Sequence, residues 1–231
     1  TPEIQAYAAE LSGTNGKASA LAFNAFDVAD LPTLDVRQET RRTHGVGPDD
    51  TVLVMAGFGF PWNGVDRAIH AMELLDPSHH LWLVGARNES DRRLVEAHAS
   101  EEVRPRIRVF GVLAPDALVE LFAGADVGLG SLAFDWHALT QAQPMKVALY
   151  LALGLPIVIN YDDVRFSSDP PFVAQVASNE PAAVRDALER LKPITPALRE
   201  QTARYASHHL SWREAARHTV ALSEAVLQVA D

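Results

Sequence analysis

Cysteine is absent from the 231 residues of this chain. Its absence excludes disulfide bonds, thiolate nucleophiles and cysteine-ligated zinc, and it fits a cytoplasmic location. No hydrophobic run approaches the ~20 residues that cross a bilayer, and the first residues show no charged and then hydrophobic leader. Positive charge is also scarce, because the net charge is −10. We therefore expect no membrane span, no secretory signal, and no general binding to nucleic acid or anionic lipid.

The composition that remains is typical of a globular protein. Hydrophobic residues make up 48% and charged residues 22%, and the length suits one large domain or two small ones. The chain begins at Thr1 rather than at a methionine, which indicates a processed chain or part of a longer one. An anionic ligand is still compatible with the acidic net charge, because backbone amides and a few local cations can bind it.

Short hydrophobic segments alternate with helical patterns through residues 51–180. The predicted strands are Thr51–Ala56, Leu81–Val84, Ile107–Phe110, Val127–Leu129, Ile157–Ile159 and Phe172–Val176. Strands and helices that alternate at this spacing form right-handed βαβ units. The sequence therefore predicts an α/β fold with a doubly wound parallel sheet.

The residues on either side of this central pattern differ from it. Residues 181–231 are predicted to be helical, with helices at Ala182–Leu191, Pro196–His208 and Ser211–Val229. Residues 1–50 are less regular, with helices expected at Pro2–Leu11 and Arg37–Gly45 and a short strand at Ala20–Phe23.

One stretch, Gln143–Asn160, combines a short helix with a buried strand. Pro144 suits the start of the helix, and Gly154 can adopt the left-handed conformation that ends it. The β-branched run Ile157–Ile159 then suits a central parallel strand. Because Lys146 lies in the first turn, where backbone N–H groups are unpaired, the stretch predicts a phosphate-binding site.

Ligands of a doubly wound sheet bind outside the carboxyl ends of its strands. The loops expected there are Gly57–Asn63, Gly85–Asn88, Gly111–Ala114, Gly130–Gln143 and Tyr161–Arg165. Gly57-Phe58-Gly59 lacks the third glycine of a dinucleotide fingerprint, and a Walker phosphate loop is absent. A dehydrogenase is therefore the least favoured interpretation, and a simple kinase or GTPase is not favoured either.

Several segments together resemble the C-terminal, nucleotide-sugar-binding domain of glycosyltransferase family 4, the retaining enzymes of the GT-B fold. They read GFGFPWNGVDRAI, LWLVGARNE, IRVFGVLAPDALVELFAGADVGLGSL, PMKVALYLALGLPIV and LSWREAA. The resemblance implies that residues 1–231 form a single Rossmann-like donor-binding domain: an interdomain segment at 1–50, a βα core at 51–180 and C-terminal helices at 181–231. The N-terminal acceptor-binding domain of the family is then missing.

The resemblance also implies the chemistry. The substrate would be a nucleoside-diphosphate sugar, with no metal cofactor, and the partners would be that nucleotide sugar and the missing domain. No nucleic acid is implied, and any peripheral membrane contact would come through the missing domain only. We expect the domain to be inactive by itself.

Departures from the family pattern favour a second hypothesis. The family's Arg and Lys, which clamp the donor diphosphate, fall on Phe58 and Asn63, and its two glutamates fall on Gln141 and Leu149. Each charge-assisted bond lost is worth roughly 1.5–3 kcal/mol. Either other groups compensate, or the chain is a degenerate, non-catalytic binding or regulatory module.

No catalytic residue can be assigned from the sequence. The candidate substrate-binding residues are Gly57, Phe58, Gly59, Asn63, Arg87, Val112, Leu113, Trp136, His137, Lys146 and Val147. By resemblance, Val112 and Leu113 lie where the backbone meets the base, and Trp136 and His137 lie in the loop that faces the donor sugar.

Each polar or aromatic candidate also has a structural interpretation. Lys146 either binds phosphate or is a solvated lysine, and Arg87 either reaches the diphosphate or forms a surface ion pair. For Asn63, capping of the helix that starts at Gly64 is favoured over binding a phosphate oxygen. For Trp136, packing is favoured over stacking on a sugar, and for His137 a residue without a ligand role is favoured.

The adjacent histidine pairs do not have the spacing of a helical metal site. His79-His80 and His208-His209 are neighbours in sequence, whereas two ligands on one helix face are four positions apart. We interpret both pairs as surface residues.

Overall fold

The computed structural model describes residues 2–3, 25–26, 34–58, 60–133, 140–166, 169–191 and 193–229. The strand expected at Ala20–Phe23 lies outside these residues. Of the helix expected at Pro2–Leu11, only Pro2 and Glu3 are described, and both are helical. The helix expected at Arg37–Gly45 is present as α2 (Leu34–Thr43).

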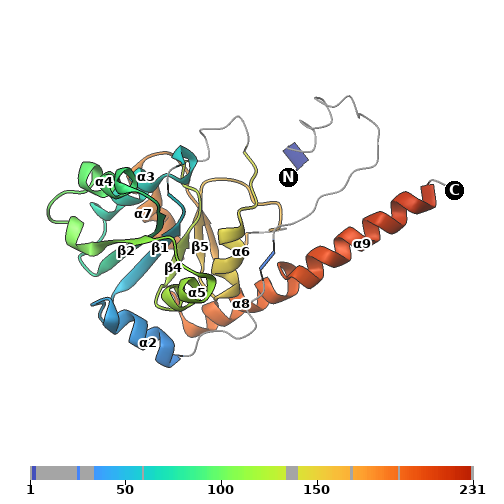
Figure 1. Ribbon diagram of the computed structural model, residues 1–231, viewed down its shortest axis with the longest axis horizontal. Helices are drawn as coiled ribbons and strands as arrows, with labels where there is room; N and C mark the ends of the chain where they lie inside the picture. Colours follow the sequence, from blue (N-terminus) through green and yellow to red (C-terminus); the bar gives the residue numbers. More distant parts are fainter. Residues whose placement is uncertain are drawn as a thin grey trace.

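Within the described residues, six parallel strands form one sheet in the order β3-β2-β1-β4-β5-β6 (Figure 1). The strands are β1 (Thr51–Ala56), β2 (His79–Ala86), β3 (Ile107–Gly111), β4 (Val127–Leu129), β5 (Ile157–Ile159) and β6 (Val173–Gln175). From the central pair β1 and β4, the later strands follow outward on both sides, β2 and β3 next to β1 and β5 and β6 next to β4. The prediction of a doubly wound parallel sheet is therefore confirmed.

Strand β2 is longer than its hydrophobic run. Leu81–Val84 is the predicted strand, but pairing with β1 extends it back to His79, opposite Thr51, and pairing with β3 extends it to Ala86, opposite Gly111. His79, which we expected at the surface, is 3% exposed because it belongs to this strand. The hydrogen-bonded ladder to a neighbour therefore sets the length of this strand, because each added pair satisfies buried backbone groups.

Helices cover both faces of the sheet (Figure 1). One face packs against α3 (Val65–Met72), α4 (Glu89–His98) and α7 (Pro181–Arg190). The other packs against α5 (Pro115–Ala123), α6 (Met145–Ala152) and α8 (Pro196–His209), and α2 lies against α5. Because both faces are covered, the central strands read as continuous hydrophobic runs rather than as alternating patterns.

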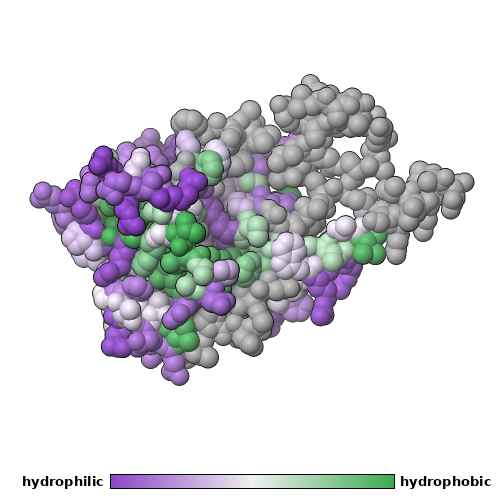
Figure 2. Space-filling view, viewed as in Figure 1, coloured by the Kyte–Doolittle hydropathy of each residue, from purple (hydrophilic) through white to green (hydrophobic). Residues whose placement is uncertain are grey.

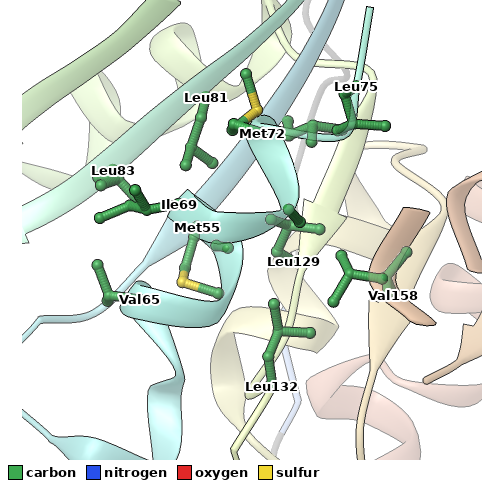
Figure 3. Packing of buried hydrophobic residues seen from close by; sticks show 14 of the residues in the cluster. Met55, Val65, Ile69, Met72, Leu75, Leu81, Leu83, Leu129, Leu132 and Val158 are labelled. Atoms are coloured by element: carbon green, nitrogen blue, oxygen red, sulfur yellow. The ribbon is translucent and has the colours of Figure 1, made fainter. Parts of the chain in front are cut away.

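Figure 3 shows the core on the first of these faces. Met55 of β1 and Leu83 of β2 contact Ile69 of α3 in one buried cluster, which continues through Leu129 of β4. Ile69 and Met55 are completely buried. Burial of such side chains stabilises a fold by about 1.5–3 kcal/mol each, so this layer holds α3 and its preceding loop firmly against the sheet.

The helix–strand stretch has the predicted form. Pro144 is the N-cap of α6, and Gly154 follows the helix with φ +71°. A Cβ at Gly154 would also lie 2.8 Å from the carbonyl oxygen of Arg199 in α8. Glycine is therefore required here for two reasons, the left-handed backbone and the close approach of α8.

Helix α2 is attached to the sheet through a charged contact. Asp126, directly before β4, accepts hydrogen bonds from Arg37 and Arg41 of α2 and from the backbone N–H of Val52. Arg41 also donates to the carbonyl oxygens of Gly47 and Asp50, in the turn that precedes β1. These bonds connect α2 to two strands at their amino ends.

The last helix, α9 (Trp212–Val229), extends away from the sheet (Figure 1). Two short 3-10 helices, η1 (Pro61–Asn63) and η2 (Arg104–Arg106), complete the elements of the described residues. Among these residues, no helix combines the length and the apolar character that a bilayer crossing requires. The surface seen in Figure 2 is mainly hydrophilic over α4 and carries hydrophobic side chains beside α5.

Candidate functional site

The strand order reverses between β1 and β4, and the segments after these two strands meet around one side chain. Lys146, in the first turn of α6, donates from Nζ to Oδ1 of Asn63 at 2.8 Å and to the carbonyl oxygen of Ala56 at 3.2 Å. The hydroxyl of Ser131, after β4, donates to the same Asn63 oxygen at 3.4 Å. Three elements distant in sequence therefore meet at the side-chain oxygen of Asn63, at the place where doubly wound sheets bind ligands.

Burial lowers the pKa of Lys146 from 10.5 to about 7. The cause is loss of hydration, which disfavours the charged form of a lysine. Both acceptors of its ammonium are neutral oxygens, so neither contributes a full negative charge. An anion placed beside this nitrogen would therefore gain a favourable interaction and would raise the pKa of Lys146 again.

Asn63 has a different role from the favoured prediction, and the capping expectation is wrong. The N-cap of α3 is Gly64, with φ +70° and no side-chain cap hydrogen bond. Asn63 instead ends η1, is buried, and accepts the bonds from Lys146 and Ser131. Its amide nitrogen also lies close to Gly57, where a Cβ would approach it to 3.1 Å.

Gly57 and Phe58 contribute to the packing of the fold and do not present the groups that a ligand would bind. Gly57 has φ +105°, and its N–H donates to the carbonyl oxygen of Val84 at 2.8 Å. That amide is therefore already satisfied by the end of β2. The Phe58 side chain is 3% exposed and belongs to the core cluster that includes Val65 and Ile69.

Arg87 lies in the loop after β2. Its side chain is exposed, and its guanidinium lies over the ring of Phe60, 5.7 Å from the centroid. Phe60 in turn stacks on Trp62, with centroids 4.5 Å apart and rings 16° from parallel. The backbone N–H of Arg87 donates to the buried carboxylate of Asp91 in the first turn of α4. This arginine is therefore held beside the loop after β1 by a cation–π contact.

The remaining candidates are distributed differently. Val112 is exposed and Leu113 is half-buried, both directly after β3. The Val147 side chain is completely buried, and its N–H donates to the carbonyl oxygen of Pro144 at 3.2 Å. Gly59, Trp136 and His137 lie outside the described residues. The structure thus brings Lys146 and Asn63 together, whereas Arg87 contacts the loop after β1 through the ring of Phe60.

The two positions that carry glutamate in the family also differ from each other. Leu149 is buried in the cluster under α6, so this position is part of the core. Gln141 precedes α6, and its Oε1 is buried with no hydrogen-bond partner among the described residues. An unpaired buried acceptor costs about 1–3 kcal/mol, so this oxygen is available for a hydroxyl or amide of a ligand.

Sequence reasoning missed Glu3 and Tyr150. The Glu3 carboxylate accepts the backbone N–H groups of Thr140 and Gln141, each at 2.8 Å, and the Thr140 hydroxyl. These bonds, the hydroxyl first, lower the pKa of Glu3. Tyr150 accepts the N–H of Ala56 at 2.7 Å, and burial raises its pKa. The partners are far apart in sequence, so no local pattern indicates either contact.

A cavity of about 700 Å³ lies elsewhere, against β6, and is lined by Asp163, Gln175 and Arg190 among others. It contains neither Lys146 nor Asn63. We regard the region around Lys146, after β1 and β4, as the candidate site because two strand ends, a helix N-terminus and a half-buried cation come together there. No group of three or more histidine, aspartate or glutamate side chains in the described residues could hold a metal ion.

A six-stranded parallel sheet with helices on both faces defines a Rossmann-like domain, one half of the GT-B fold. Residues 49–191 match the sequence profile of the family described as glycosyl transferases group 1, and the chain belongs to that family. No curated protein sequence matches it.

Solved glycosyltransferase structures resemble the chain in fold. Sucrose-phosphate synthase from Thermosynechococcus elongatus aligns with a TM-score of 0.77 and 16% identity, over 99% of this chain and 57% of that one. Anabaena Alr3699/HepE, in complex with UDP and glucose, aligns with a TM-score of 0.71 and 16% identity, over 97% and 61%. WaaG, a glycosyltransferase involved in lipopolysaccharide biosynthesis, aligns with a TM-score of 0.63 and 20% identity, over 90% and 55%. The chain thus spans little more than half the length of these proteins.

Proposed function

We propose that this chain is the nucleotide-sugar-binding domain of a retaining glycosyltransferase that acts in the cytoplasm and transfers a hexose from a nucleoside-diphosphate sugar. The acceptor would bind to a further domain, so the chain by itself is expected to be inactive. The observation that carries the proposal is the half-buried ammonium of Lys146, whose hydrogen-bond acceptors at the switch point, within the part of the chain that the structure describes, are two neutral oxygens. The complexes of Alr3699/HepE with UDP and with UDP-glucose support the ligand class.

Lys146 would bind the donor diphosphate. When the bond from the sugar to the diphosphate breaks, negative charge develops on the leaving phosphate oxygen. A cation and a helix N-terminus already in position stabilise that charge without reorganising during the reaction. Because Lys146 reaches Asn63, it returns a positive charge to the position where the family has a lysine. Charge from the protein removes the need for a metal ion at this site.

Gln141 would bind the sugar. Its buried Oε1, which has no hydrogen-bond partner in the segments that the structure describes, can accept a hydrogen bond from a sugar hydroxyl, although without the negative charge of the family's glutamate. Arg87, in the loop after β2, would contact the nucleotide after leaving the ring of Phe60. Positioning of the donor, together with stabilisation of the leaving group, would then supply most of the catalysis.

A nucleotide titration tests the proposal. Isothermal titration of the chain with UDP, GDP, ADP and dTDP, and with their sugar conjugates, is expected to give one binding site that Lys146→Met weakens about tenfold or more. Arg92→Met is the matched control, because it removes an exposed cation from α4 and leaves the region around Lys146 unchanged. If no nucleotide binds at millimolar concentration, even to the chain with its further domain, the enzyme proposal is wrong.

The second candidate is a non-catalytic module, and one observation favours it. Phe58 and Leu149 stand at two positions that are charged in the family. Both side chains are buried in the core, so they serve packing and not ligand binding. Such a module would keep its thermal stability but bind none of the nucleotides, which distinguishes it from the enzyme in the same titration.

A further inference from the structure

Two histidines meet between the helices that follow β1 and β2. Nδ1 of His98, the last residue of α4, and Nε2 of His70 in α3 share a hydrogen bond of 3.2 Å, in which the tautomers of the rings decide the donor. The ring centroids are 5.0 Å apart, and the rings are inclined by 73°. Both side chains are half-buried. The two residues are 28 positions apart in sequence, so only the packing of α3 against α4 brings them together.

This separation suits a shared transition metal. Two imidazole nitrogens at about 2.0–2.1 Å from a tetrahedral Zn²⁺ lie about 3.3 Å from each other. The observed 3.2 Å differs little from that value, so loss of the shared proton to solvent and rotation of both rings away from the hydrogen-bond axis would direct two lone pairs at one ion. We propose that His70 and His98 bind one divalent transition-metal ion of the zinc class, which bridges α3 and α4.

The surroundings leave room for the rest of the coordination shell. His98 and Asp66 line the same groove of about 420 Å³. Asp66 lies one helical turn before His70, on the same face of α3. No third ligand is gathered around the pair among the described residues, so water completes the shell in this conformation. Arg67 also lines the groove, but its guanidinium is directed to the carbonyl oxygen of Leu132 and to Asn179.

The site is separate from the region around Lys146 and has a structural consequence. Asn63 lies just before α3, and Arg87 just before α4. An ion that joins the two helices would restrict the motion of both preceding loops. Imidazole ligands suit Zn²⁺, Ni²⁺ and Cu²⁺, whereas Mg²⁺ prefers oxygen ligands and water. Magnesium is therefore the control ion, which should not bind at this site.

Metal titration of the chain tests the proposal. Isothermal titration with ZnCl2 at about pH 7.5, where imidazoles are mainly neutral, is expected to give one site and a higher Tm. His70→Gln/His98→Gln should weaken binding at least tenfold, and MgCl2 should give no binding. The matched control is His208→Gln/His209→Gln, which removes two histidines of α8 whose ring centroids are 6.4 Å apart and should leave zinc affinity unchanged.

A spectroscopic measurement on the unaltered chain avoids dependence on variants that fail to fold. One equivalent of Cu²⁺ should give an electron paramagnetic resonance spectrum with coupling to two imidazole nitrogens. Absence of zinc binding, equal weakening by the two double variants, or copper coupled to fewer than two nitrogens would each overturn the proposal. None of these results depends on nucleotide binding, so the two proposals fail independently.

Discussion

The ammonium of Lys146 and the side-chain oxygen of Asn63 are 2.8 Å apart, although the residues are separated by 83 positions. Asn63 ends the loop after β1, and Lys146 begins α6, so the contact joins the two halves of the sheet at their boundary. The family lysine at position 63 and the chain's own Lys146 would therefore place their charges in nearly the same volume. We therefore infer that the positive charge that the family carries at position 63 is supplied in this chain by Lys146.

Moving the cation back tests this inference. Lys146→Asn should weaken nucleoside-diphosphate binding about tenfold or more, because one charge-assisted bond of roughly 1.5–3 kcal/mol is lost. Adding Asn63→Lys should recover most of that affinity in isothermal titration, since the charge returns from the other side. The double variant keeps the composition and net charge of the chain. A folded double variant that binds as weakly as Lys146→Asn contradicts the inference.

The pKa of Lys146 makes stability depend on pH in a defined direction. Burial lowers this pKa to about 7, whereas an unfolded lysine titrates near its ordinary value of 10.5. Between these values the unfolded chain binds more protons, so the contribution of Lys146 to the free energy of unfolding rises with pH. It is least favourable below about pH 7 and increases until about pH 10.

Lys146→Met isolates that contribution. The unfolding free energy of the native chain minus that of the variant should increase from about pH 6.5 to about pH 9.5 in urea titrations, because other titrations are common to both. A difference that stays constant over this range would show that Lys146 keeps its ordinary pKa in the fold.

Gly154 should be intolerant of a side chain. Gly154→Ala puts a Cβ on a backbone with φ +71° and 2.8 Å from the carbonyl oxygen of Arg199. The left-handed conformation alone costs roughly 1–2 kcal/mol, so we expect a loss of at least about 1 kcal/mol in urea denaturation. At Gly111 the nearest atom to an added Cβ is 3.8 Å away. Gly111→Ala should therefore change stability by less than about 0.5 kcal/mol, and equal losses would contradict the argument.

Asp126 should contribute far more to stability than an exposed acidic residue of α2, the helix with which Asp126 pairs. Asp126→Asn removes the carboxylate that pairs with Arg37 and with Arg41, whose side chain is only 5% exposed. Breaking a buried pair costs about 3–5 kcal/mol, and we expect the lower end because Asp126 is 14% exposed.

Glu39→Gln is the comparison for Asp126. It breaks the pair with Arg42 on α2, in which both side chains are largely exposed and screened by solvent, and should shift the denaturation midpoint far less than Asp126→Asn. Similar shifts in the denaturation midpoint for the two variants would show that burial does not govern these ion pairs.

Local sequence patterns predict those strands and helix ends whose position depends on a few consecutive residues. The predicted strands β1, β4 and β5 have the observed bounds because each coincides with a hydrophobic run, and α6 ends at a glycine that must be left-handed. Lys146 was also identified from sequence, since a lysine in a first helical turn is unusual. Asn63 was misjudged because its position before a helix suggested a cap, and nothing nearby indicates a partner from α6.

The sequence by itself thus determined the fold class, the approximate positions of the helices and strands, and the family to which the chain belongs, because hydrophobic periodicity, glycine and proline act over a few residues. The tertiary structure alone decided which side chains meet: Lys146 with Asn63, Glu3 with Thr140, and His70 with His98. Such contacts depend on how whole helices pack on the sheet, and packing is set by many distant residues together. For that reason the type of site can be read from the chain, whereas its actual contacts cannot.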